Sequence, residues 1–223
     1  MPCQFEPRRQ EIINNLLDVY MQRTTADVDA GIMWYPTAQR IVREWSEHYH
    51  YSVDTVAAVI AALSPQLEWS RNLVIADDIL AQRNPSVGGA LFKNIAKAKL
   101  LRDDEGENQR WGECKLSLSE RMTLTFPQGP KVTNFALNLT GEMQNAVTID
   151  THCAQAALNN PLSIIYLKWT PYRIFAECYA QTARQTEYTP ATFQAIIWHV
   201  WKRLYPRVWK LQNRKQWHTM GEY

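Results

Sequence analysis

The chain has few cysteines and no long apolar run. Its four cysteines stand apart at positions 3, 114, 153 and 178, without the Cys-x-x-Cys spacing or histidine clusters of zinc and iron–sulfur sites. No apolar run approaches the roughly 20 residues that cross a bilayer, and no signal peptide is recognisable. We therefore expect no metal, no cofactor and no membrane partner. The expected setting is a soluble, intracellular one, cytoplasmic or nucleoid-associated.

Strand signals are also missing, because no segment sustains polar–apolar alternation and only eight glycines interrupt the chain. Apolar residues instead recur with helical spacing, which predicts an all-α fold. The length fits a single domain, 1–223, built as two lobes. Residues 103–120 are polar and predict a loop with a short helix. The expected helices cover residues 8–23, 37–49, 70–82, 91–102, 130–139, 151–158, 172–185 and 190–204.

Two further helix starts carry capping signals. Ser52 precedes Asp54 and the run VAAVIAAL at 56–63, which is apolar on every side. A serine oxygen accepts a backbone N–H at a helix start, so Ser52 predicts the cap of a buried central helix. Thr189 and Pro190 are suited to be the cap and first residue of the last helix.

The net charge is only +2, but basic residues outnumber acidic ones near the C-terminus. Residues 199–223 hold six Lys or Arg against one acid, and tryptophans interleave with them in the tail 205–223. Such a mixture neutralises phosphates and stacks on bases, which predicts DNA contacts. The alternatives are tryptophans that seal the core and an interface for a partner protein. The expected DNA-binding residues are Lys202, Arg203, Lys210, Arg214 and Lys215.

Segment 129–153 holds the candidate catalytic pair. Gly129 and Pro130 open a helix, so Lys131 falls in its first turn, and Asp150 precedes the next helix. We expect the amides after Pro130 to be unpaired and, with Gly129, to bind a phosphate. The Lys131 amine is then placed to act as a nucleophile, with the Asp150 carboxylate stabilising charge. The alternatives are a solvated loop lysine and an ordinary helix-capping aspartate.

A polar turn follows the expected buried helix, in the sequence LSPQLEWSRN at residues 63–72. Pro65 ends the helix there. Polar and aromatic side chains on a rigidly supported turn suit insertion into a duplex or contact with a base. The alternative is a capping turn with a packed tryptophan. The DNA-binding candidates of this turn are Gln66, Trp69, Arg71 and Asn72.

Taken in order, these segments resemble the helix-hairpin-helix DNA glycosylases, the superfamily that includes endonuclease III. The turn at 63–72 is similar to that family's LSAQ-type turn, with Gln66 in the glutamine's place. Residues 91–103, LFKNIAKAKLLRD, are similar to its Gly-Leu-Tyr-x-x-Lys-Ala helix. The hairpin-like segment 120–139 includes FPQGPKVTNFALNL, and residues 147–158, VTIDTHCAQAAL, are similar to its Val-Asp-Thr-His segment.

The resemblance implies a two-lobed helical fold that acts on double-stranded DNA with a flipped nucleotide. Lys131 would attack C1′ and form a Schiff base, Asp150 would stabilise positive charge on the sugar or accept a proton, and Gln66 would fill the gap left by the base. Three features depart from the family: the hairpin is one residue short, Gln155 replaces an arginine, and the iron–sulfur cysteines are absent.

Two other functions remain open. The same scaffold could carry a base-modifying transferase, as in phage thymine hypermodification, in which an amine replaces a pyrophosphate on an activated hydroxymethyl pyrimidine. A catalytically silent DNA-binding module is the other alternative, binding through the basic cluster 202–215. In each case we expect a monomer.

Overall fold

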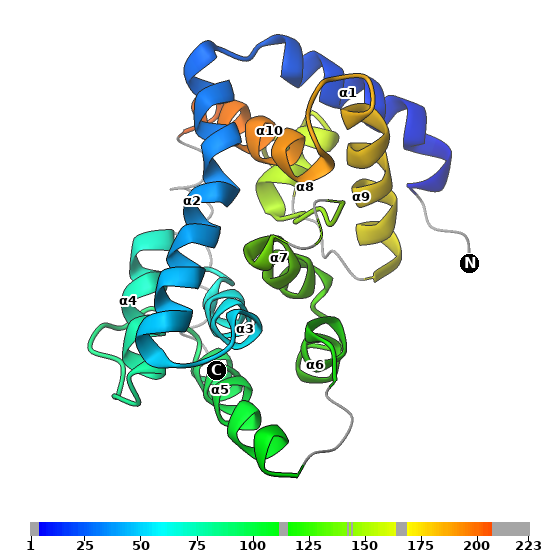
Figure 1. Cartoon of the computed structure of the whole chain (residues 1–223). Coiled ribbons are helices and arrows are strands. Elements are labelled where there is room, and N and C mark those ends of the chain that lie inside the picture. The colour runs from blue at the N-terminus through cyan, green and yellow to red at the C-terminus, as the bar shows by residue number, and fades with distance from the viewer. Residues whose placement is uncertain (1–4, 112–115, 142, 144, 164–168, 207–223) are drawn as a thin grey trace, which may run out of the picture. The chain divides into compact units, whose positions relative to one another are not determined.

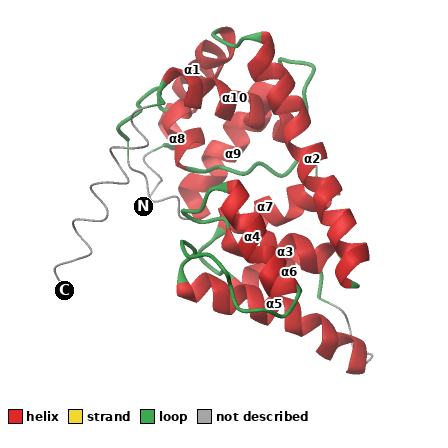
Figure 2. Cartoon of the chain, turned by 90° about the vertical axis from the view of Figure 1, so that its left-hand side faces the viewer, coloured by secondary structure: helices red, strands yellow, loops and turns green. Residues whose placement is uncertain are grey.

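The computed structural model describes residues 5–111, 116–141, 143, 145–163 and 169–206. Within these residues the secondary structure is helical and contains no strand, which confirms the all-α class (Figure 2). The elements are η1 (Glu6–Arg8), α1 (Arg9–Met21), α2 (Thr25–Tyr49), α3 (Val53–Leu63), α4 (Trp69–Leu80), α5 (Phe92–Trp111), α6 (Leu118–Thr125), α7 (Pro130–Thr140), α8 (Thr151–Ala157), α9 (Trp169–Ala183) and α10 (Pro190–Leu204).

The chain divides into two compact units. The central unit is Tyr35–Thr148, and the terminal unit combines residues 1–34 with residues 149–223. The chain passes from one unit to the other within α2 and again between Thr148 and Ile149. The terminal unit is therefore assembled from both ends of the sequence.

Helix α3 is the core of the central unit, and α4, α5 and α7 pack against it. Every residue from Thr55 to Leu63 is buried, as the uniformly apolar run predicts. The Ser52 hydroxyl accepts the Thr55 N–H, which confirms the expected cap. Buried Arg121 joins α6 to this core by donating to the Thr55 hydroxyl and the Leu101 carbonyl.

Segment 120–139 forms two packed helices, α6 and α7, joined by the turn 126–129. A capping box starts α6, because Ser117 and Glu120 exchange side-chain and backbone hydrogen bonds. Helix α7 runs from Pro130 to Thr140 and is capped by Gly141, which takes the left-handed conformation (φ 84°) that favours glycine at a helix end.

The terminal unit packs α1, α8, α9 and α10 together, as Figure 1 shows. Tyr179, Phe193 and Trp201 are fully buried within it, so Trp201 is a core residue. The Thr189 hydroxyl accepts the Thr192 N–H and Pro190 is the first residue of α10, which confirms the expected start.

Two helices are longer than the sequence predicts. Helix α2 begins at Thr25 instead of residue 37 and continues through Pro36, whose exposed ring removes only one backbone hydrogen bond. Helix α5 extends to Trp111 through the polar residues expected to form a loop. Local features of the sequence hid the full length of both helices. Helix α2 contains a proline, and the last part of α5 lacks apolar periodicity.

Candidate functional site

Lys131 lies in the first turn of α7, in the central unit, and its side chain is partly exposed. Among the described residues its ammonium has no hydrogen-bonding or ion-pair partner. The helix start therefore presents a lysine whose amine is not committed to a structural contact.

The amides around Lys131 correct one expectation. The Val132 and Thr133 N–H groups both donate to the Gly129 carbonyl, and the Gly129 N–H donates to the Phe126 carbonyl. These donors close the turn and begin the helix, so they are not free for a phosphate. Gly129 is therefore a turn residue, and the Lys131 N–H is the amide left without an acceptor among the described residues.

The turn between α3 and α4 approaches the same face of α7. The rings of Trp69 and Phe135 meet edge to face with centroids 6.3 Å apart. Phe135 is four residues after Lys131, so both lie on one face of the helix. Gln66 is exposed in this turn with a φ of 62°, a conformation that costs a non-glycine residue energy and often marks functional turns.

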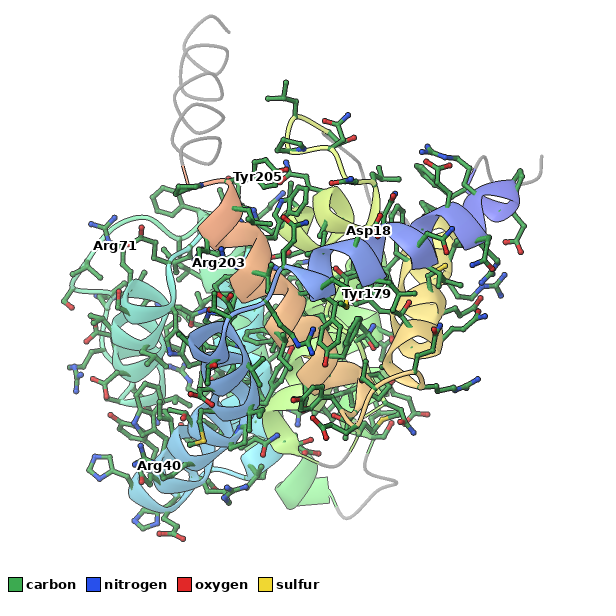
Figure 3. The ribbon with its side chains drawn as sticks, turned by 90° about the horizontal axis from the view of Figure 1, so that it is seen from above. Asp18, Arg40, Arg71, Tyr179, Arg203 and Tyr205 are labelled. Carbon is green, nitrogen blue, oxygen red and sulfur yellow. The ribbon has the colours of Figure 1, made fainter. Side chains whose placement is uncertain are left out.

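Arg71 and Asn72 have different environments. Arg71 is exposed on α4 (Figure 3), where a Cβ added at Gly89 would lie 3.3 Å from its Cδ, and it has no salt bridge among the described residues. Asn72 is only 1% exposed and its Nδ2 donates to the Ile60 carbonyl at 3.0 Å. The expectation that Asn72 contacts DNA is therefore wrong, because its amide ties α4 to the end of α3.

Asp150 is the N-cap of α8, in the terminal unit, and its side chain is partly exposed. Its Oδ1 accepts the Cys153 N–H at 2.9 Å, which is the capping contact. Its Oδ2 accepts the indole Nε1–H of Trp198, also at 2.9 Å. Two N–H donors to a carboxylate stabilise its ionised form and fix its plane.

The ring of Trp198 lies within a group that we call the indole cluster. Lys202 places its Nζ 3.9 Å from the centre of the Trp198 ring, and the Trp34 ring lies 5.6 Å away at a 31° tilt. Burial lowers the pKa of His199, and the positive charge of Lys202 lowers it further. The negative charge of Asp27 opposes this shift of the pKa without reversing it, so the imidazole is neutral at neutral pH. The indole cluster consists of Trp34, His152, Trp198, His199 and Lys202.

Arg203, at the end of α10 (Figure 3), already has an acidic partner. Its Nε lies 2.9 Å from Asp27 Oδ2, and its Nη2 donates to the Gln22 carbonyl at 2.6 Å. Burial alone would raise the pKa of Asp27, but hydrogen bonds from Thr24 and Arg203 lower it. Arg203 therefore has an ion pair within the terminal unit, and its contact with DNA stays a prediction.

The remaining expected contacts lie outside the described residues. These are Lys210, Arg214 and Lys215, which belong to the basic tail 205–223. Among the residues that the structure does describe, no helix combines the length and apolar character needed to cross a membrane. No group of three or more His, Cys, Asp or Glu in the same part of the chain could hold a metal ion.

Lys131 and Asp150 both stand at helix starts, as the sequence predicts, but in different units. The family model that matches this chain covers residues 4–204 and describes DUF7178, a family of unknown function. The chain belongs to this family. Comparisons with curated proteins and with solved structures gave no match.

In this DUF7178 chain both candidate catalytic residues and the whole indole cluster lie within the matched range. The whole basic tail, 205–223, lies beyond it. Sequence analysis missed the contact of Trp198 with Asp150, because 48 positions separate the two residues. The local sequence offers no signal for this contact beyond the tryptophan itself, which is partly exposed on α10.

Proposed function

We propose that this DUF7178 protein is a DNA base-excision glycosylase with lyase activity, in which Lys131 is the nucleophile and Asp150 the supporting carboxylate. The observation that carries most weight is the state of the Lys131 amine. It is partly exposed at a helix start and has no acceptor among the described residues, so no contact with any of them has to break before it reacts.

The chemistry assigned to Lys131 begins with a nucleotide flipped out of the duplex. The neutral amine forms a bond to C1′ while the bond from C1′ to the base breaks. The base leaves with that electron pair and gains a proton. The nitrogen then loses a proton, the bond from C1′ to the ring oxygen breaks, and the ring oxygen takes up a proton, which leaves a protonated Schiff base between C1′ and the lysine nitrogen.

Asp150 has two features that suit the supporting role. Its carboxylate is oriented by the N–H groups of Cys153 and Trp198, and its side chain remains partly exposed. A fixed negative charge stabilises the positive charge that develops on the sugar.

The turn that carries Gln66, Trp69 and Arg71 supplies the proposed DNA contacts. Gln66 is exposed and strained, Arg71 offers a guanidinium without a salt bridge among the described residues, and Trp69 contacts the face of α7 that bears Lys131. Gln66 would occupy the gap in the duplex, and Arg71 would neutralise a phosphate.

Borohydride trapping tests the covalent step. Duplexes containing uracil, damaged bases or modified pyrimidines are incubated with the protein and reducing agent, and covalent adducts are separated by denaturing electrophoresis. We expect the parent chain to be trapped and Lys131→Ala not to be. The matched control is Lys93→Ala, which removes an exposed lysine of α5 in the same unit. An adduct that survives Lys131→Ala would overturn the assignment.

A further inference from the structure

Trp198 has no role in the proposed reaction, yet its side chain is hydrogen-bonded to the proposed catalytic carboxylate of Asp150. Its indole Nε1–H donates to Asp150 Oδ2 at 2.9 Å, while the Cys153 N–H occupies Oδ1 at 2.9 Å. The capping bond comes from the helix that begins at Asp150. The indole bond comes from α10, a separate element, and is not required to start α8.

The indole itself is held in place by neighbours on two elements. Trp34, on α2, packs against its ring with centroids 5.6 Å apart. Lys202, one turn further along α10, places its ammonium 3.9 Å from the ring centre, a cation–π distance. His199 and His152 meet the ring edge to face. Rotation of the indole away from Asp150 would lose these contacts together.

We propose that Trp198 is a positioning residue for Asp150. Its N–H fixes the plane of the carboxylate and favours the ionised form at a partly exposed position. Trp34 and Lys202 hold the indole in the orientation that this requires. Lys202, expected from the sequence to contact DNA, thereby gains a second role through Trp198. The catalytic consequence rests on the proposed function, whereas the effect on Asp150 itself does not.

The titratable groups around Asp150 allow its protonation to be observed separately. Burial raises the pKa of the Cys153 thiol and of the Tyr179 hydroxyl well above their ordinary values, so both stay neutral during a carboxyl titration. Among the residues that the structure describes, His152, His199 and Lys202 are further titratable groups against the indole partner of this carboxylate. Their ordinary protonation ranges lie above that of an aspartate.

The experiment compares Trp198→Phe with the parent chain, without DNA, by a carbon-detected NMR titration of the Asp150 carboxyl group. Asp150→Asn assigns the signal. Phenylalanine keeps an aromatic ring but removes the donor. We expect Asp150 to take up its proton at a pH about one unit higher in Trp198→Phe, because a hydrogen bond to the charged form is lost. Trp201→Phe, which removes an indole N–H of the same helix, should leave the titration unchanged.

A second measurement needs no change at Trp198. In the parent chain, the indole Nε1–H resonance of Trp198 should shift with the same midpoint as the Asp150 carboxyl signal, and Asp150→Asn should abolish that shift. Equal Asp150 titrations in the parent and Trp198→Phe, or an indole resonance that ignores Asp150, would overturn the positioning role.

Activity gives the third readout and separates the two proposals. If the parent chain releases bases, Trp198→Phe should lower kcat about tenfold with little change in KM, and the acid limb of its pH profile should move up with the titration. A parent chain that releases no base while its Asp150 titration still depends on Trp198 would reject the glycosylase and retain the positioning role.

Discussion

Arg71 and Asn72 are neighbours in α4, yet one is exposed and the other is 1% exposed and bonded to the Ile60 carbonyl. Successive residues of a helix point about 100° apart, so the polar character of the pair could not tell which one faces the core. Residue type also could not indicate that Arg203 pairs with Asp27, which lies 176 positions away. At the scale of single residues, the sequence identifies candidate DNA-contacting residues. Partners that are distant in the sequence then determine which of these side chains are already engaged within the protein.

Asp78 gives a pH-dependent prediction at the same scale. Its carboxylate accepts the Ser86 hydroxyl and N–H, both at 2.6 Å, and pairs with Arg83. The hydrogen bonds from Ser86, and then Arg83, lower the pKa of Asp78 although burial opposes them. The pKa of Asp78 is therefore lower in the folded state than in the unfolded state, where it is about 3.9. Its ionised carboxylate stabilises the fold fully at pH values above the unfolded-state pKa. This stabilisation is lost as the pH falls through the folded-state pKa.

We therefore expect Asp78→Asn to lower the free energy of unfolding at pH 7 by about 1–3 kcal/mol. The difference in the free energy of unfolding between variant and parent should shrink as the pH falls from about 4 through the lowered pKa of Asp78, because the parent carboxylate then also becomes neutral. Urea unfolding at a series of pH values measures both effects. A difference that stays constant down to pH 2 would contradict the assignment of the stability to an ionised Asp78.

At the scale of elements, local rules predicted the capped helix starts but missed the start of α2 and the end of α5. Ser52 and Thr189 cap α3 and α10 as expected, because a cap depends on a few adjacent residues. The extension of α5 to Trp111 has no apolar stripe to announce it. The N-terminal part of α2 contains Gly31 and Pro36, two residues that usually disfavour helix interiors, and both are accommodated there.

Gly31 has a packing reason for its place in α2. A Cβ at this position would lie 2.5 Å from the Ile196 Cγ1 and 2.7 Å from its Cα and N, so α2 and α10 approach closely at this point. Backbone atoms of α10 cannot move aside as a flexible side chain does. We expect Gly31→Ala to lower the free energy of unfolding by about 1–3 kcal/mol, despite the better helix propensity of alanine.

The matched control is Gly88→Ala, because a Cβ there meets no atom within 4 Å. Its free energy of unfolding, measured in urea, should stay within about 0.5 kcal/mol of the parent value. Equal stability of the two alanine variants would show that α2 and α10 do not approach as closely as described.

At the scale of the whole molecule, the all-α class followed from composition and periodicity, whereas the division into units did not. The terminal unit joins residues 1–34 to residues 149–223, and no local pattern announces a boundary inside α2. The same division explains why the candidate site was only partly foreseeable. Lys131 and Asp150 were found through helix-start signals, but Trp198 reaches Asp150 only because the terminal unit folds its distant segments together.

Mass spectrometry of the DNA after incubation tests the proposed function most directly. The duplex panel used for trapping is incubated with the protein, and free bases and digested nucleosides are quantified with and without added amines. The glycosylase predicts release of a free base and formation of an abasic site, both lost in Lys131→Ala and strongly reduced in Asp150→Asn. Nucleosides that gain the mass of an amine without base release, or DNA that is bound but unchanged across the panel, would contradict it.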